Sequence, residues 1–292
     1  MQVNLILSWY KGEIYVSKLA ENRSVAVVAP VHNEESTLDQ CLASVENQKV
    51  DEIIVVLDMC TDNSEMIARE HAKKDPRIKV VTLPEHNFKT HYSAETANFG
   101  VSKAKSDVIC FLDADTVLGP NYISLLLPYL KRPVVSVAGR LIFTSKRFLQ
   151  FHETIGGTGR LFFRELWEEV GGLQDIEACD TFFDLEILKR GYKFKVIEKA
   201  VMYDVRKYSM RKLTLRAIRI GRGRRQLSQS FFFMIGHGLY YLTMTPFGFV
   251  ELLANITGYL TTHRRASREG MKLYEAKRIR EIIQKLRTRT SQ

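Results

Sequence analysis

Two carboxylates separated by one residue, Asp113 and Asp115, end a short apolar run in the segment ICFLDADT. Just past the end of a strand, where the backbone bends, both can reach one ligand. A hard divalent cation such as Mg²⁺ or Mn²⁺ takes one or two protein carboxylates and completes its shell with phosphate oxygens. Bound here, it would neutralise a diphosphate leaving group and hold it in place. The alternative is structural, because Asp pairs are also common in turns and at helix starts.

The elements that must position these residues form an α/β pattern. Between residues 24 and 137, short apolar runs alternate with segments whose apolar residues recur at helical spacing. The predicted strands are 24–31, 52–57, 78–83, 107–112 and 133–139, and the predicted helices are 35–48, 63–74, 92–104 and 121–131. The runs are continuously apolar rather than alternating, which predicts a mostly parallel sheet covered by helices on both faces.

Polar groups follow three of these strands directly, at residues 30–34, 58–62 and 113–115. In a doubly wound sheet, ligands bind beyond the carboxyl ends of the strands. All three groups are therefore expected along one edge of the sheet, in one crevice.

The region from 138 to 205 contains a glycine-rich loop near Gly157 and the segment ACDTFFDLEILKRGYK. That segment predicts a helix with Asp180 or Thr181 near its start and Gly191 at its end, followed by the strand KFKVIEK. Asp184 has the position of an ordinary helix residue, although it is close enough in sequence to act with Asp180.

Several short motifs occur in a fixed order along residues 24–200. They are Pro30-Val-His-Asn-Glu34, Asp58 with Asp62 and Ser64, Ala97-Asn-Phe-Gly100, Leu112-Asp-Ala-Asp115, Phe163-Arg with Val170-Gly-Gly172, and Asp180 before Gly191-Tyr192. In this order the sequence resembles the family 2 glycosyltransferases of the GT-A fold, and among them the membrane-associated polyprenyl- and dolichyl-phosphate sugar synthases. The resemblance implies a catalytic domain at 1–205, with a nucleotide-sugar half at about 24–137 and an acceptor half at about 138–205.

The resemblance also implies roles for the matching residues. Asp113 is expected to lie against the ribose or the metal, and Asp115 is expected to be the principal ligand of Mn²⁺ or Mg²⁺. The residues expected to hold the base and ribose of a UDP- or GDP-sugar are Pro30, His32, Asn33, Glu34 and Asp58.

Asp180 matches the family's catalytic Asp, which takes the proton from the acceptor hydroxyl or lies close to an acceptor phosphate. Attack opposite the leaving diphosphate requires a base on the far side of the sugar, so the implied outcome is inversion at the anomeric carbon. The structural alternatives are that Asp180 is only an N-cap, and that Asp58 and Asp62 cap the helix from Asn63.

The sequence departs from the family pattern at three points. Leu57 stands where many relatives have another Asp before Asp58, and Cys179 replaces the acidic residue that often precedes the catalytic Asp. The Gln that dolichyl-phosphate mannose synthases place two residues after the second Asp is absent. A Gln-x-x-Arg-Trp motif, the mark of processive polysaccharide synthases, is also absent, which favours a single transfer per encounter.

The charge of the chain is uneven. Residues 206–292 hold 19 Lys and Arg against 4 Glu and no Asp, a net charge of +15, whereas residues 1–205 have a net charge of −5. Such a basic region attracts nucleic acid or anionic lipid headgroups. The four scattered cysteines and a short N-terminal apolar run predict a reducing compartment and no secretory signal.

A 30-residue apolar stretch, residues 231–260, lies inside this basic region. It is long enough to span a bilayer, but Pro246, Glu251 and Asn255 interrupt it, and both flanks are basic. We therefore predict a monotopic apolar helical hairpin, followed by a basic terminal helix, that binds the anionic cytoplasmic face of the cell membrane. The alternative is a hairpin packed on the catalytic domain or on a second subunit, which makes the C-terminal region a candidate homodimer interface.

These observations favour a metal-dependent, inverting glycosyltransferase that moves one sugar from a nucleoside diphosphate sugar to a lipid-linked or membrane-proximal acceptor. A nucleotidyltransferase of similar fold is the second hypothesis, although it would usually have a glycine-rich loop with a basic residue after the first strand. A nucleic-acid-binding protein is the third. No nucleic-acid partner is predicted, because the basic segments flank the apolar stretch instead of alternating with exposed aromatic residues.

Overall fold

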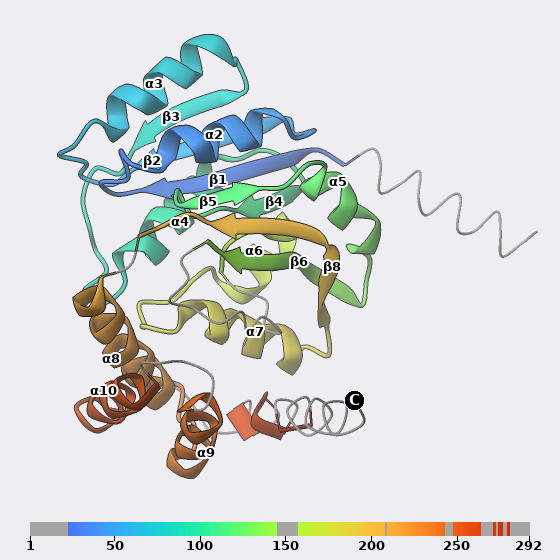
Figure 1. The fold of residues 1–292 in the computed structure, drawn as a ribbon. Coiled ribbons are helices and arrows are strands. Elements are labelled where there is room, and N and C mark those ends of the chain that lie inside the picture. The colour runs from blue at the N-terminus through green and yellow to red at the C-terminus, as the bar shows by residue number, and fades with distance from the viewer. Residues whose placement is uncertain are drawn as a thin grey trace, which may run out of the picture.

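A computed structural model describes residues 23–144, 157–207, 209–242 and 248–263, together with 271–272, 274–276 and 279–280. The strands in these ranges form one sheet in the order β3-β2-β1-β4-β7-β6-β8-β5 (Figure 1). They are β1 (Val25–Val31), β2 (Glu52–Leu57), β3 (Ile78–Thr82), β4 (Val108–Phe111), β5 (Thr116–Leu118), β6 (Val134–Phe143), β7 (Arg160–Phe163) and β8 (Lys193–Asp204).

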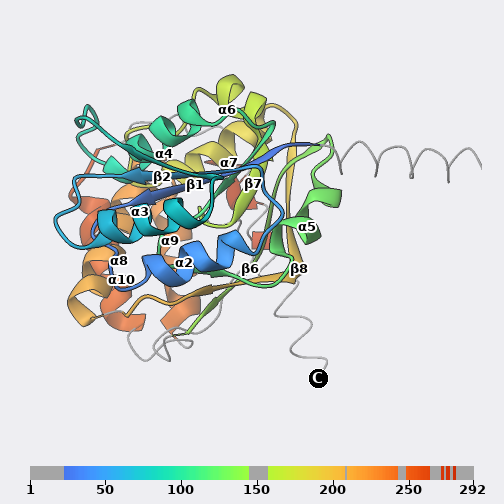
Figure 2. The same cartoon turned by 90° about the horizontal axis from the view of Figure 1, so that it is seen from above.

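Helices cover both faces of the sheet. Those with named bounds are α2 (Leu38–Glu46), α3 (Ser64–Lys74), α4 (Tyr92–Lys103), α5 (Tyr122–Leu126), α6 (Arg164–Val170), α7 (Cys179–Lys189), α8 (Met210–Gln226), α9 (Phe231–Leu242) and α10 (Gly248–Leu260). Figure 2 shows α2 and α3 on one side of β1 and β2, and α4, α6 and α7 on the other. Burial on both faces explains the continuously apolar strands.

The sheet is mostly parallel, as the strand composition predicts. β3, β2, β1 and β4 are parallel neighbours, and β6 is parallel to β8. β7 runs antiparallel to β4 and β6, and β5 runs antiparallel to β8. The predicted α/β class is therefore confirmed.

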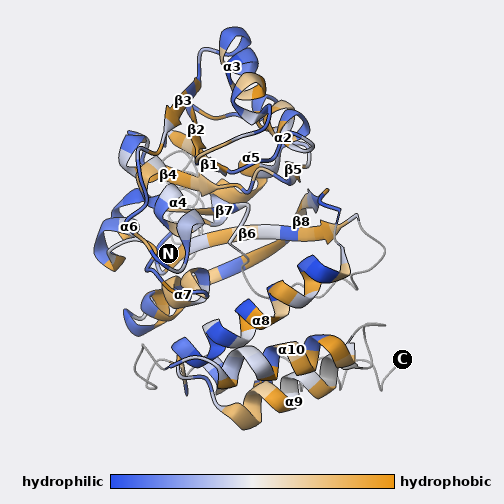
Figure 3. Cartoon of the chain, turned by 90° about the vertical axis from the view of Figure 1, so that its left-hand side faces the viewer, coloured by the Kyte–Doolittle hydropathy of each residue, from blue (hydrophilic) through white to orange (hydrophobic). Residues whose placement is uncertain are grey.

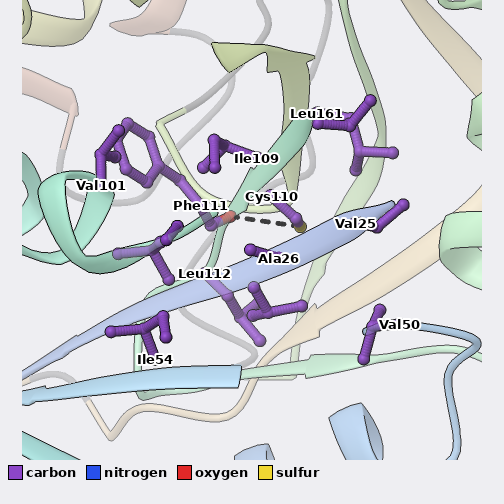
Figure 4. Packing of buried hydrophobic residues seen from close by; sticks show 14 of the residues in the cluster. Val25, Ala26, Val50, Ile54, Val101, Ile109, Cys110, Phe111, Leu112 and Leu161 are labelled. Atoms are coloured by element: carbon purple, nitrogen blue, oxygen red, sulfur yellow. Dashed lines mark hydrogen bonds between the residues drawn. The ribbon is translucent and has the colours of Figure 1, made fainter. Parts of the chain in front are cut away.

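The main core lies between the central strands and their helices. Figure 4 shows residues of β1 and β4 packed with Ile54 of β2, Val101 of α4 and Leu161 of β7. Helix α4 approaches the sheet closely at Gly100, where a Cβ atom would stand 2.4 Å from a methyl group of Val28. A larger residue at this position would push α4 off the strands that end at the candidate site.

Four elements differ from the sequence prediction. The helix predicted at 121–131 is only one turn of α-helix, α5, followed by a 3₁₀ turn at Leu127–Tyr129 that contains Pro128, because proline cannot donate a backbone hydrogen bond. The strand predicted at KFKVIEK continues to Asp204. β5 and β7 are short, and no periodicity of apolar residues in the sequence predicts them.

The C-terminal part packs beside one end of the sheet, with α8, α9 and α10 grouped together in Figure 1. α8 and α10 cross in close contact, because Cβ atoms at Gly221 and Gly258 would each stand 2.0 Å from a backbone oxygen of the other helix. Figure 3 shows α9 and α10 as largely hydrophobic and α8 as mixed. The apolar stretch thus forms two helices, but their insertion as a membrane hairpin stays a prediction. Much of the predicted basic terminal helix lies outside the described residues.

None of the helices in the described ranges is both long and apolar enough to cross a membrane.

Candidate active site

Four of the predicted site residues meet around one cavity of about 1120 Å³ at the carboxyl edge of the sheet. Pro30 after β1, Asp113 and Asp115 after β4, and Asp180 at the start of α7 all line it. A typical small-molecule pocket measures roughly 300–1,000 Å³. The cavity is therefore large enough to hold more than one small ligand.

A tight turn brings the two aspartates to the cavity wall. Between β4 and β5 the Thr116 N–H donates to the Asp113 carbonyl at 2.9 Å, and Thr116 pairs with Asp204 of the antiparallel strand β8. The Asp113 N–H donates to Thr158 Oγ1 at 3.0 Å. The backbone bends past the strand end as the sequence predicts, and Asp113 and Asp115 reach the same space.

The electrostatic environment of this turn favours an incoming cation. Burial is the largest cause that raises the pKa of Asp113, and the charge of Asp115 adds to it. Because the Asp113 side chain is itself open to the cavity, water moderates this rise. Burial also raises the pKa of Asp115, which is only 5% exposed; Arg206 opposes the rise and Asp204 adds to it. A cation would stabilise the charged form of both groups.

Arg206 supplies a cation at this position. Its Nε lies 2.5 Å from Asp115 Oδ2, and its Nη2 pairs with Glu34 Oε1. Burial raises the pKa of Glu34, and the guanidinium of Arg206 opposes that rise. The side chain therefore joins the loop after β1 to the loop after β4.

The donor set fits a divalent cation that shares ligands with a phosphate. Within the residues that the structure describes, no group of three or more His, Cys, Asp or Glu side chains is arranged to hold a metal ion alone. Asp113 and Asp115 offer one or two carboxylates, and the guanidinium of Arg206 occupies the position on Asp115 that a metal cation would take. Mg²⁺ and Mn²⁺ accept such a partial set when phosphate oxygens complete the shell.

Asp180 lies in the first turn of α7, where it is half-buried and lines the cavity. The N-cap is Ala178, so the interpretation of Asp180 as only an N-cap is wrong. Its Oδ1 accepts from the N–H of Thr181 at 2.7 Å, and Gly157 lies beside it, where a Cβ would stand 3.9 Å from Oδ2. One carboxylate oxygen is thus held by the helix, and the other lies next to Gly157, which has no side chain.

Asp184, one turn further along α7, has a different environment. It is 3% exposed, and its Oδ1 lies 2.7 Å from Nη2 of Arg160 on β7. The guanidinium also lies over the ring of Phe183. This buried ion pair ties α7 to the sheet, and Asp184 does not line the cavity.

Apart from Pro30, the residues predicted to hold the base do not line the cavity. Asp58 is 4% exposed; its Oδ2 accepts from Thr96 Oγ1 at 3.0 Å, and its Oδ1 lies 2.7 Å from His86 Nε2. His32 Nδ1 lies 2.6 Å from the Asp58 carbonyl oxygen. Asn33 has a left-handed backbone with φ of 54°.

These contacts brace the loop after β1 against the loop after β2. Asn33 Oδ1 accepts from the Thr61 N–H at 2.8 Å, and Asp62 accepts from the N–H groups of Glu35 and Ser64. Asp62 therefore accepts from the first amide of α3, although the N-cap itself is Asn63, whereas Asp58 is paired with Thr96 and His86 instead. Of the residues predicted for the donor, Pro30 and Asp113 line the cavity; a direct contact of the others with a nucleotide stays a prediction.

Sequence reasoning missed two sets of charged residues at the site. One is the pair Asp204 and Arg206, whose only signal is a polar segment after a strand. The other is α8, whose cations line the cavity and are exposed; they are Lys212, Arg216, Arg219 and Arg222. The cavity thus receives residues from both sides of the predicted domain boundary at 205.

His91 was also missed. It caps α4, since its Nδ1 accepts from the Ala94 N–H at 3.2 Å, and it lines the cavity. Burial, helped by the charge of Arg219, lowers the pKa of the imidazole. A neutral ring whose Nδ1 accepts carries its proton on Nε2, so His91 is a hydrogen-bond donor.

The fold and this site define a GT-A-type domain, and solved structures share it. A mannosyltransferase, PcManGT of Pyrobaculum calidifontis in complex with GDP-Man and Mn²⁺, has a TM-score of 0.57 at 17% identity, covering 89% of this chain and 80% of that one. TarS of S. aureus in complex with UDP-GlcNAc has a TM-score of 0.54 at 15% identity, covering 68% of this chain and 66% of that one.

The sequence comparisons name the family. The profile of Glycosyl transferase family 2 matches residues 26–191, more than half of the chain. The chain belongs to glycosyl transferase family 2. It is 29% identical over 218 residues to the "Probable glycosyltransferase YdaM" of Bacillus subtilis, covering 64% of this chain and 51% of that protein.

A second relative is the glycosyltransferase GlyG of Streptococcus pneumoniae, which is 32% identical over 104 residues, covering 35% of this chain and 33% of that protein. The chain spans about half or less of the length of these curated relatives.

Proposed function

We propose that this chain transfers a single sugar from a UDP- or GDP-sugar to a lipid-linked or membrane-proximal acceptor, with a divalent metal and with inversion at the anomeric carbon. The observation that carries the proposal is that Asp113, Asp115 and Asp180, from elements far apart in the sequence, line one cavity. The GDP-Man and Mn²⁺ bound by PcManGT and the UDP-GlcNAc bound by TarS support a nucleotide-sugar donor.

The donor end of the site is the turn between β4 and β5. Asp115, with Asp113, would hold Mn²⁺ or Mg²⁺, which supplies neutralisation of the negative charge that develops on the leaving diphosphate. The N–H of Glu34 donates to Ser64 Oγ and so holds the loop after β1. This loop provides the wall against which the nucleoside lies. Asp58 is buried, and the contact of its carbonyl with His32 keeps this loop in place.

The acceptor end is formed by Asp180. The Thr181 N–H holds one oxygen of the carboxylate, which leaves the other oxygen to receive the proton of an acceptor hydroxyl. As the acceptor oxygen bonds to the anomeric carbon, the bond from that carbon to the diphosphate oxygen breaks on the opposite face. The product has the inverted configuration. An acceptor phosphate, already anionic, would instead lie beside Asp180 and receive the sugar directly.

The chemistry of α8 supports an anionic, lipid-like acceptor. Lys212, Arg216, Arg219 and Arg222 line the cavity together with the exposed apolar side chains Leu215 and Ile220. Cations beside apolar groups suit a phosphate attached to a hydrocarbon chain.

The remaining C-terminal helices support a contact with a membrane. Phe232 is 85% exposed, Phe249 64% and Leu260 68%, and the neighbouring helix is basic. Large exposed apolar groups close to positive charge are typical of proteins that bind the surface of an anionic bilayer. We therefore propose residues 206–292 as a membrane-association region on the cytoplasmic face, with a second copy of the chain as the alternative partner.

The first test is calorimetric titration of UDP, GDP and their common sugar conjugates into the protein, with Mn²⁺ and then with chelator. We expect one nucleotide to bind in a metal-dependent manner, and Asp115→Asn to weaken that binding by more than about tenfold. The control is Glu168→Gln, whose side chain is 71% exposed in an i,i+4 pair on α6. Absence of binding for every nucleotide by a folded protein would refute the proposal.

A further inference from the structure

The backbone fixes Arg206 beside Asp115. The register of β5 and β8 pairs Thr116 with Asp204, and the next amide, of Val205, donates to the Asp115 carbonyl at 3.0 Å. The Arg206 N–H donates to Asp204 Oδ1, also at 3.0 Å. The start of the Arg206 side chain therefore stays close to Asp115 whatever its far end contacts.

The guanidinium occupies an oxygen that a metal ion would use. Asp115 has two carboxylate oxygens: Oδ2 lies 2.5 Å from Arg206 Nε, and Oδ1 is 3.5 Å from the hydroxyl of Thr116. The same guanidinium pairs with Glu34. A divalent cation can coordinate both carboxylate oxygens of Asp115 only if the guanidinium of Arg206 moves away from Oδ2.

The Arg206 side chain borders open space. Its side chain is 36% exposed and lines the cavity, so it has open space to turn into when it leaves Asp115. A guanidinium carries five N–H donors in a planar fork that matches phosphate oxygens. The diphosphate of a donor would enter the same cavity.

We propose that Arg206 is a displaceable counter-cation. It holds Asp115 while the site contains no metal, and it moves to the diphosphate when a divalent cation and the nucleotide bind together. The inference rests on the proposed function, because it assigns Arg206 to the diphosphate of the same donor. The exchange makes the metal and the nucleotide bind cooperatively. The metal alone binds weakly because Arg206 competes with it for Asp115. The nucleotide alone binds weakly because Arg206 stays on Asp115 until the metal displaces it.

This exchange predicts two effects of opposite sign for Arg206→Gln. Without nucleotide, Mn²⁺ should bind about tenfold more tightly, because the variant removes the competing charge-assisted hydrogen bond. With saturating Mn²⁺, UDP or GDP should bind about tenfold more weakly, because the diphosphate loses a cation. A residue that merely stabilised the fold would move both affinities in the same direction.

The experiment is a pair of titrations on the full chain, Mn²⁺ alone and then UDP or GDP at saturating Mn²⁺, for the wild type and Arg206→Gln. The matched control is Lys212→Gln, which removes another exposed cation that lines the cavity; the charge of Lys212 acts on Glu34. We expect Lys212→Gln to change the affinity for Mn²⁺ less than about twofold. Thermal unfolding checks that each variant is folded.

Tighter binding of Mn²⁺ alone in Arg206→Gln, not shared by Lys212→Gln, supports the exchange. Unchanged or weaker binding of Mn²⁺ in Arg206→Gln overturns it, as does equal tightening in both variants, which would mean that any lost positive charge has the same effect. The proposed function is judged separately: a wild type that binds neither UDP nor GDP with Mn²⁺ overturns that function, whereas the Mn²⁺ titration without nucleotide still decides whether Arg206 competes for Asp115.

Discussion

Asp180 and Asp184 lie one turn apart in α7, and their environments predict that the same substitution affects a different property at each position. Asp180 is half-buried at the cavity, with one oxygen held by the Thr181 N–H. Asp184 is 3% exposed and 2.7 Å from Arg160, whose side chain is also 3% exposed. Asp180→Asn should therefore affect the reaction, and Asp184→Asn should affect folding.

The magnitudes follow from these environments. Breaking a buried ion pair by removing one partner costs about 3–5 kcal/mol, and Asn keeps one acceptor for the guanidinium, so Asp184→Asn should cost about 3 kcal/mol of unfolding free energy. That is a large fraction of the roughly 5–15 kcal/mol that stabilises a typical protein. Asp180→Asn at an open cavity should cost less than about 1 kcal/mol. Loss of a general base should lower the transfer rate by roughly 10²–10⁴-fold.

The assays are urea denaturation, and transfer of labelled sugar from the bound nucleotide-sugar to a membrane lipid extract. Donor affinity, measured by calorimetry, should be unchanged in Asp180→Asn. The double variant Arg160→Met with Asp184→Leu should unfold closer to the wild type than Asp184→Asn does, because both buried charges leave together.

The reasoning fails if Asp184→Asn unfolds within about 1 kcal/mol of the wild type and loses transfer to the same extent as Asp180→Asn. That result would mean that Asp184 takes part in the reaction and that its contact with Arg160 contributes little. A large loss of stability in Asp180→Asn would likewise contradict its placement at an open cavity.

Three further predictions concern the framework. Gly258→Ala should destabilise the chain by about 1–3 kcal/mol, because its Cβ would stand 2.0 Å from a backbone oxygen of α8, whereas Gly236→Ala in α9, with nothing within 4 Å, should be neutral or stabilising by up to about 1 kcal/mol in urea denaturation. Burial alone would raise the pKa of Glu52, but hydrogen bonds from a lysine, a serine and a backbone amide hold that pKa at about 2. Glu52→Gln should therefore lose stability, and urea denaturation at a series of pH values should show the full loss above the ordinary Glu pKa of 4.5. The difference from the wild type should disappear as the pH falls towards 2. Phe232→Ser, at a side chain that is 85% exposed, should weaken sedimentation with anionic vesicles, whereas Met66→Ser on α3, at 53% exposed, should not; equal loss in both would contradict a membrane contact through α9.

The sequence alone determined the class of the fold and the edge at which the site lies. Continuously apolar strands must be buried on both faces, so the parallel sheet and its covering helices followed from residue types within short windows. The carboxyl ends of parallel strands share one edge, and this placed Asp113 and Asp115 on the same edge as the loop after β1. Motif order added Asp180, which the structure brings to the same cavity.

Only the tertiary structure decided which polar side chains face the cavity and which are consumed by the fold. Asp58 and Asp184 have the same residue type as Asp115, yet each is buried against a partner distant in sequence, His86 and Arg160. The position of Arg206 depends on the pairing of β5 with β8, two strands too short or too far apart for local periodicity to join. A carboxylate's role is set by the charges and solvent around it, and those neighbours are brought together by long-range packing that no short window of sequence contains.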